Sequence, residues 1–212
     1  MYIIRQNDDF PPIEYAGEDG LLAIGGDLSL KRLTTAYQRG IFPWYDASQP
    51  TLWWSPDPRM VLFPEKLKVS KSMKQVLKKG NFRVTYNEAF AEVLQNCASI
   101  DRKGQSGTWL VREMIDAYIG LHQLGMAISI EVWEENELVG GLYGIYLREK
   151  QVFCGESMFA KKSNASKFGF IQMVKNLQAE GVKLIDCQVY TKHLASLGAE
   201  EISRGKFLKY LE

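Results

Sequence analysis

The stretch LVGGLYGIYLREKQVFCGESMF, residues 138–159, decides the fold that we expect for this chain. Two apolar runs, residues 138–147 and 151–154, flank a charged turn at residues 148–150. β-Rich runs joined by a short polar connection are typical of a β-hairpin. Glycines inside the first run indicate a bulge, or the close approach of a ligand or another backbone segment.

The second run of the hairpin leads into Gly155, Glu156, Ser157 and Met158. This order places a carboxylate at the end of a strand that we expect to be buried. Burying an ionised Glu without a partner costs free energy or raises its pKa. Glu156 is therefore either a functional residue or a solvated residue of a surface turn, and the pattern fits both.

The composition is that of a soluble globular protein, with 46% hydrophobic and 24% charged residues among 212. This length fits one large domain, or a domain with a small annex. No apolar run is long enough to span a membrane, and the N-terminus lacks a signal-peptide pattern. The three cysteines show no CxxC spacing, which favours a reducing compartment over disulfides or a zinc site. We therefore expect a cytoplasmic protein.

Helical and strand patterns alternate along the chain. The first sixty residues look irregular and show one helix, with Ser29 as its N-cap and Gly40 as its stop. Beyond them we expect a half-buried strand at 127–133, with Ser129 and Glu131 on its polar face. The remaining expected elements, besides the hairpin, are helices at 87–97, 108–124, 164–180 and 193–197 and strands at 182–189 and 200–204. This order predicts an α/β (α+β) protein with a mixed sheet covered by helices, similar to the acyltransferase-type fold.

Residues 182–189, VKLIDCQV, contain two polar side chains in an otherwise apolar strand. The period of two puts Asp186 and Gln188 on one face as neighbours. We expect Asp186 to stay ionised and to hold the Gln188 side-chain amide. The pair either forms a satisfied structural hydrogen bond or lines a cleft.

Residues 66–83 hold six lysines and one arginine and no acidic residue. Such a run is usually a solvated surface. In a chain of net charge +1 it favours contact with a polyanion such as a phosphate backbone. The candidate residues are Lys66, Lys68, Lys71, Lys74, Lys78 and Lys79.

Known cofactor motifs are missing from the sequence. It contains neither GxxxxGK[ST] nor GxGxxG, and His122 and His193 show no metal-ligand spacing, so we expect no cofactor and no metal. An acyltransferase of this fold usually takes acetyl-CoA, whose pyrophosphate binds a glycine turn at a helix N-terminus. The nearest segment, residues 122–127, closes a helix instead of opening one. A CoA site is therefore absent or displaced.

Ten short motifs in one register resemble the leucyl/phenylalanyl-tRNA–protein transferase family. They are GGDL (25–28), YQRGIFPW (37–44), LWWSPDPR (52–59), GTW (107–109), EVW (131–133), ELVGGLYG (137–144), FCGESMF (153–159), NASK (164–167), LIDCQV (184–189) and SLGA (196–199). The resemblance runs from about residue 20 to the C-terminal end. It implies a small N-terminal domain, residues 1–62, and an acetyltransferase-like (GNAT-like) catalytic domain, residues 63–212.

The resemblance also implies an activity. Such an aminoacyltransferase moves Leu or Phe, and less well Met, from aminoacyl-tRNA to the N-terminal Lys or Arg of an acceptor protein, which marks it for N-end-rule degradation. The implied partners are Leu-tRNA, Phe-tRNA and acceptor proteins or peptides, with no membrane, and we expect a monomer. The donor ester is already activated, so holding ester and amine together can lower much of the barrier. An acetyl-CoA-dependent N-acetyltransferase and a non-catalytic tRNA- or peptide-binding module are the alternatives.

The family motifs assign roles by position. Glu156, Asp186 and Gln188 would be the catalytic residues, and the six lysines would bind tRNA. Trp44 and Trp109 would flank the aminoacyl-adenosine. The other substrate-binding residues implied are Leu142, Phe153, Gly155, Ser157, Met158, Met173, Leu177 and Ile185. Departures from the family pattern at Leu142 and Met173 concern the shape of this pocket.

Overall fold

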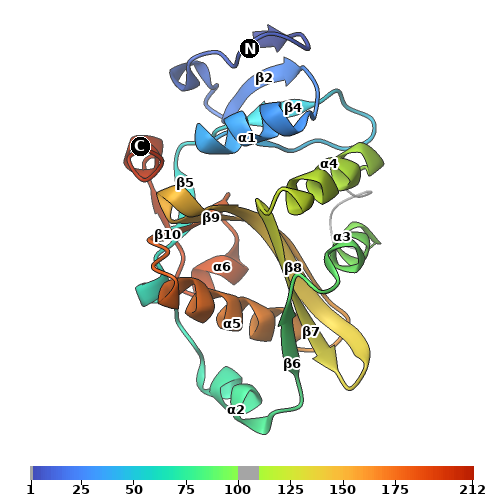
Figure 1. The fold of residues 1–212 in the computed structure, drawn as a ribbon. Coiled ribbons are helices and arrows are strands. Elements are labelled where there is room, and N and C mark those ends of the chain that lie inside the picture. The colour runs from blue at the N-terminus through green and yellow to red at the C-terminus, as the bar shows by residue number, and fades with distance from the viewer. Residues whose placement is uncertain (1, 100–109) are drawn as a thin grey trace.

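The computed structural model describes residues 2–99 and 110–212, and their strands form two sheets (Figure 1). The four-stranded sheet has the order β1-β2-β4-β3, and the seven-stranded sheet has the order β11-β5-β10-β9-β8-β7-β6. The strands are β1 (Tyr2–Ile4), β2 (Leu21–Gly25), β3 (Phe42–Pro43), β4 (Leu52–Trp54), β5 (Arg59–Leu62), β6 (Arg83–Tyr86), β7 (Ala127–Glu134), β8 (Glu137–Leu147), β9 (Val152–Ala160), β10 (Leu184–Gln188) and β11 (Glu200–Ile202). The predicted mixed sheet covered by helices is confirmed.

Helices cover both faces of the seven-stranded sheet. Side chains of α5 share one apolar cluster with strands β8, β9 and β10, whereas α3 and α4 pack with the other face. Helix α2 lies at the opposite end of the molecule from the four-stranded sheet (Figure 1). The helices are α1 (Leu30–Gln38), α2 (Lys71–Lys79), α3 (Phe90–Ser99), α4 (Arg112–Gln123), α5 (Ala165–Ala179), α6 (Lys192–Ser196) and α7 (Arg204–Leu208). None of these helices combines the length and apolar composition needed to cross a bilayer.

The N-terminal segment is more regular than its sequence indicated. Helix α1 is confirmed, with the Ser29 hydroxyl accepting from the Arg32 backbone N–H at 3.4 Å. The expectation of an otherwise irregular segment is wrong, because β1 to β4 are present. These strands have two to five residues each, which is too short for an alternating pattern to stand out.

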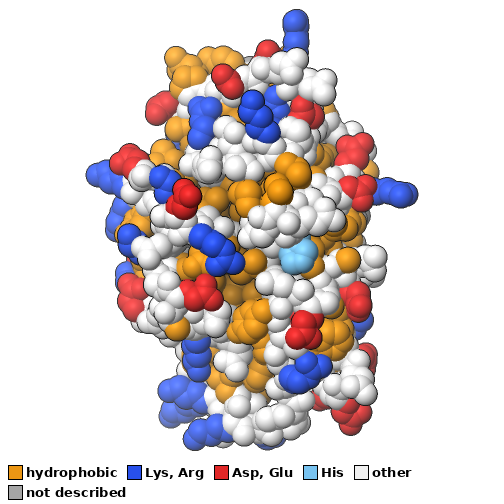
Figure 2. Space-filling view, in the orientation of Figure 1, with side chains coloured by type: hydrophobic (Ala, Val, Ile, Leu, Met, Phe, Trp, Pro, Cys, Tyr) orange, Lys and Arg blue, Asp and Glu red, His pale blue; other side chains and the backbone are white. Residues whose placement is uncertain are grey.

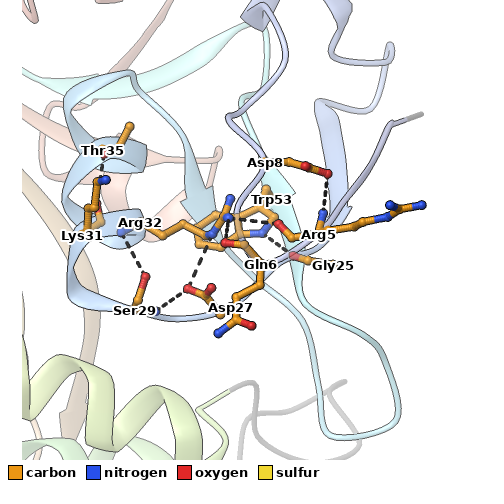
Figure 3. A network of polar contacts seen from close by, with 10 residues as sticks. All are labelled: Arg5, Gln6, Asp8, Gly25, Asp27, Ser29, Lys31, Arg32, Thr35 and Trp53. Carbon is orange, nitrogen blue, oxygen red and sulfur yellow. Dashed lines mark hydrogen bonds and ion pairs between the residues drawn. The ribbon is translucent and has the colours of Figure 1, made fainter.

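A polar network binds this small sheet to α1 (Figure 3). The Arg32 guanidinium donates to the backbone oxygens of Arg5 and Gln6 at 3.1 and 2.6 Å. It also pairs with Asp27 at 3.6 Å, and the Trp53 indole N–H donates to the Gly25 carbonyl at 2.9 Å. Trp53 is fully buried, as expected for a residue that fills a small core.

The predicted hairpin is β8 and β9, joined by a 3₁₀ turn at Arg148–Lys150. Its register shifts between Tyr143 and Gly144, and a Cβ on Gly144 would lie 2.2 Å from the Cys154 carbonyl oxygen. Glycine is therefore required at this bulge. Strand β9 continues to Ala160, so Glu156 lies within a strand and not at its end.

Two further expectations differ from the structure. Strand β7 is buried on both faces, because α3 covers the face that carries Ser129 and Glu131. The Glu131 carboxylate is satisfied there by the Thr85 and Ser129 hydroxyls. Helix α4 begins at Arg112, and the first two residues of the helix expected at 108–124 lie outside the described residues.

Candidate active site

A cavity of about 420 Å³ opens where strands β9 and β10 separate. The two strands pair in parallel only between Leu184–Asp186 and residues 152–154. Beyond that point residues 155–158 of β9 and residues 187–189, which begin in the bulge of β10, line the cavity. The four-stranded sheet contributes Phe42 and Pro43 to the same wall. The site is therefore a gap in the sheet, and residues 42–44 of the N-terminal segment form part of its wall.

Most of the predicted substrate-binding residues lie on this cavity. The lining residues among them are Trp44, Leu142, Gly155, Ser157, Met158, Met173 and Ile185. Phe153 and Leu177 do not line it but lie behind the wall, in the same apolar cluster as Met173 and Ile185. Trp109 lies outside the described residues. Trp44 is 38% exposed, which leaves its ring available for a ligand.

Glu156 is a wall residue of this cavity and the end of a chain of hydroxyl groups. The Tyr118 hydroxyl donates to Glu156 Oε2 at 2.8 Å, and the Tyr37 hydroxyl lies 2.7 Å from that of Tyr118. Desolvation raises the pKa of the Glu156 carboxyl to about 7, although hydrogen bonds from Tyr118 and Tyr37 act in the opposite direction. This carboxyl can therefore exchange a proton near neutral pH.

Sequence reasoning missed both tyrosines. Tyr37 belongs to α1 and Tyr118 to α4, and both are buried. Each was recognisable only as an inward-facing residue of a helix. Since a buried tyrosine hydroxyl usually has a hydrogen-bond partner, the signal was the presence of two such residues in a chain with an unassigned carboxylate, Glu156, on an apolar strand.

The expected contact between the Asp186 carboxylate and the Gln188 side-chain amide is wrong. Asp186 Oδ1 instead accepts from the Gln188 backbone N–H at 3.0 Å. The Gln188 amide Nε2 donates to Glu156 Oε1 at 3.5 Å. The register of β10 against β5 shifts between Asp186 and Gln188, and this bulge breaks the period of two. Gln188 consequently faces the cavity, whereas Asp186 is not among its lining residues.

Asp186 has a partner that sequence reasoning missed. Arg59 Nε and Nη2 donate to its two carboxylate oxygens at 2.8 and 2.7 Å, and both residues are 1% exposed. The guanidinium also lies between the rings of Phe42 and Phe207, 4.8 and 4.6 Å from their centroids. A buried carboxylate on an apolar strand requires a cation or hydrogen-bond donors, but nothing local in the sequence identified Arg59 as the partner of Asp186.

The predicted tRNA-binding lysines form a separate region. Lys71, Lys74, Lys78 and Lys79 belong to α2, and all four are exposed. Basic side chains gather at this end of the molecule (Figure 2). Lys66 and Lys68 precede the helix and are also exposed, but Lys66 pairs with Glu200 at 2.6 Å.

Comparison with known proteins gives consistent matches along the chain. The family model described as "Leucyl/phenylalanyl-tRNA protein transferase" matches residues 61–212, and the model of that family's N-terminal domain matches residues 26–57. A protein named leucyl/phenylalanyl-tRNA–protein transferase from Christiangramia forsetii is 61% identical over 211 residues, covering 100% of both chains. A protein of the same name from Flavobacterium johnsoniae is 55% identical and covers 100% of this chain and 99% of its own.

Solved structures give weaker matches. The structure of L-PGS from Bacillus licheniformis has a TM-score of 0.44 at 11% identity, over 82% of this chain and 57% of that one. A GCN5-related N-acetyltransferase from Kribbella flavida has a TM-score of 0.40 at 9% identity, over 79% of this chain and 58% of that one. This chain thus spans less than two thirds of either of those two proteins. On the family models and the full-length relatives, the chain belongs to the leucyl/phenylalanyl-tRNA protein transferase family.

Proposed function

We propose that this chain moves Leu or Phe, and less well Met, from aminoacyl-tRNA to the N-terminal Lys or Arg of an acceptor protein. The observation that carries the proposal is the cavity between β9 and β10, with Glu156 and Gln188 on its wall, in a chain whose relatives bear the name of this reaction. An acetyl-CoA-dependent N-acetyltransferase is not favoured by those relatives.

The cavity suits an aminoacyl ester. Leu142, Met158, Met173 and Ile185 offer an apolar surface to the side chain of the amino acid. Such a surface selects by size and shape, with about 1–3 kcal/mol for each methylene. The partly exposed ring of Trp44 is placed to stack on the terminal adenosine.

Glu156 and Gln188 have different roles in the proposed reaction. The acceptor α-amine attacks the ester carbonyl carbon, a C–N bond forms, and the bond from that carbon to the ribose oxygen breaks. Glu156 accepts the proton that the amine loses and returns it to the leaving ribose oxygen. The match of proton affinities supports this role, because an α-amine has an ordinary pKa of about 7.7–8.0 and that of Glu156 is about 7.

Gln188 orients the amine in the same step. Its Nε2 donates to Glu156, which turns its carbonyl oxygen toward an incoming N–H group. An amide is a weak base, so the contribution of Gln188 is orientation and stabilisation of charge. Tyr118 holds the other oxygen of Glu156 in place.

The lysines of α2 bind the tRNA backbone in this proposal. The helix presents four exposed lysines and has no acidic residue in its first turn. Each phosphate that a lysine contacts releases counterions, so this binding weakens steeply with salt. We also propose that the enzyme acts as a monomer in the cytoplasm and that its products enter N-end-rule degradation.

Transfer of label from [14C]Leu-tRNA tests the proposal. The protein is incubated with the donor and either an Arg-initiated peptide or a matched peptide that begins with Asp. We expect label only in the Arg-initiated peptide. Labelled acetyl transfer from acetyl-CoA would instead support the acetyltransferase alternative, and tRNA binding without any transfer would support a non-catalytic module.

A further inference from the structure

The ion pair between Arg59 and Asp186 is buried and bidentate, but neither residue lines the cavity. Buried ion pairs contribute little net stability, because desolvation offsets much of their attraction. An apolar pair of similar volume would often fold as well. This pair therefore calls for a role besides holding β5 to β10.

The third contact of the Asp186 carboxylate points to that role. Its Oδ1 accepts the backbone N–H of Gln188 and so spans the bulge. Gln188 has a φ of 58°, in the left-handed region that is unfavourable for a non-glycine residue. A fixed acceptor at Asp186 offsets that cost, and the bulge turns the Gln188 side chain toward Glu156.

Arg59 is itself held from two sides. The ring of Phe42, a wall residue of the cavity from β3, lies on the guanidinium, and so does the ring of Phe207 from α7. Two hydrogen bonds and two rings restrict the orientation of the guanidinium. The carboxylate that it holds is consequently restrained in rotation.

We propose that Arg59 is a positioning residue of the transfer reaction, which acts through the Asp186 carboxylate to hold the bulge that aims Gln188 into the cavity. This inference rests on the proposed function, since it takes Gln188 to act on the acceptor amine. Lysine at position 59 keeps the charge but loses the paired hydrogen bonds, so Arg59→Lys is the informative substitution.

A double-mutant cycle in kcat tests this role. Arg59→Lys should lower kcat about tenfold to a hundredfold, the size expected for misplacing a catalytic group, with the KM for Leu-tRNA unchanged. In the Gln188→Ala background the same substitution should lower kcat less than about twofold, because the group that it positions is gone. Arg204→Lys is the matched control, since the Arg204 guanidinium also donates a hydrogen bond, to the Ser55 carbonyl at 2.6 Å, but makes none to Asp186 among the described residues. It should leave kcat unchanged.

The outcomes distinguish the proposed role of Gln188 from the inferred role of Arg59. Wild-type kcat in folded Gln188→Ala protein would contradict the proposed role of Gln188. Loss of kcat in that variant, together with an equal Arg59→Lys effect in both backgrounds, would overturn the inference about Arg59 alone.

Phe207→Leu covers the case in which Arg59→Lys does not fold. It removes one ring from the guanidinium and leaves both hydrogen bonds in place. It should lower kcat by a smaller factor and again only when Gln188 is present. An equal loss in both backgrounds would overturn the inference.

Discussion

The cavity between β9 and β10 differs from the lysine face of α2 in the environment of its charged groups. The lysine face is formed by Lys71, Lys74, Lys78 and Lys79. The cavity holds a desolvated carboxylate whose neighbours are fixed by hydrogen bonds. The lysine face holds exposed cations. The contrast suggests that bond formation depends on the placement of a few atoms, whereas tRNA binding depends on the number of charges.

The largest effect should follow removal of the charge in the cavity. If Glu156 accepts the amine proton, Glu156→Gln should lower kcat by about 10²–10⁴. The wild-type rate should fall about tenfold for each pH unit below the Glu156 pKa of about 7, because the proton acceptor is the ionised carboxylate. In the variant the acid limb should instead follow the acceptor amine, whose ordinary pKa is about 7.7–8.0. A pH–rate profile of both proteins measures it, and an unchanged acid limb in the variant would assign that limb to another group.

The same substitution should raise stability. Burial raises the folded-state pKa of Glu156 from 4.5 to about 7, so the folded state binds more protons than the unfolded state in this window. Stability is therefore lost as the pH rises from 4.5 through 7. Glu156→Gln carries no charge and should melt at a higher temperature than the wild type at pH 8, with a smaller difference at pH 4.5. A lower Tm at pH 8 would show that the carboxylate is stabilising.

Gln188→Ala should have the next largest effect, a loss of kcat by about 10²–10³ with little change in donor KM. Gln188 is partly exposed, so its truncation should leave the Tm near that of the wild type. Gln178→Ala, at an exposed position of α5, is the matched control and should leave kcat unchanged. A fall in Tm that accounts for the lost activity would make the role of Gln188 structural.

Charge reversal on the lysine face should weaken the binding of tRNA and leave the chemical step unchanged. Replacing Lys71, Lys74 and Lys78 by Glu should raise KM for Leu-tRNA and flatten its salt dependence by about one unit of slope per lost contact. A minimal leucyl-adenosine donor should be unaffected. Reversal of the exposed Lys31, Lys175 and Lys183 gives the same change in net charge and should leave KM near the wild-type value. Equal losses with both donors would make the lysine face structural.

The smallest effect concerns the shape of the cavity. Met158→Ala removes part of the cavity wall and so enlarges the cavity. It should therefore lower the rate with Leu more than the rate with Phe, by about tenfold or less. Competition between Leu-tRNA and Phe-tRNA in one reaction measures the ratio. An unchanged ratio in folded protein would place side-chain selection elsewhere.

Local sequence patterns predicted the helices and strands that are determined by residues close together in the sequence. Helix α1, the β8–β9 hairpin and helix α5 followed from these patterns, whereas the substrate-binding residues came from the family resemblance, and most of them line one cavity. The contacts of the site were not predictable in this way. Arg59 and Asp186 are 127 residues apart, and Tyr118 and Glu156 are 38 apart. Only the folded sheet brings them together.

The bulge in β10 shows why periodicity was insufficient. A period of two placed Asp186 and Gln188 side by side, but the register shift turns one toward Arg59 and the other toward Glu156. The acceptor that spans the bulge, Asp186, is local in the sequence, but its cation, Arg59, is supplied by tertiary structure. The period of two in residues 182–189 therefore gave no sign of the bulge that directs Gln188 into the cavity.

The separation of the two regions is tested most directly by single-turnover transfer of Leu at saturating Leu-tRNA. The rate is measured for the wild type, for Gln188→Ala and for the variant with Lys71, Lys74 and Lys78 replaced by Glu. We predict a rate about 10²–10³ lower in Gln188→Ala and a wild-type rate in the lysine variant, because saturation restores binding but not the placement of the amine. A wild-type rate in folded Gln188→Ala protein, or an equal loss in both variants, would contradict the account.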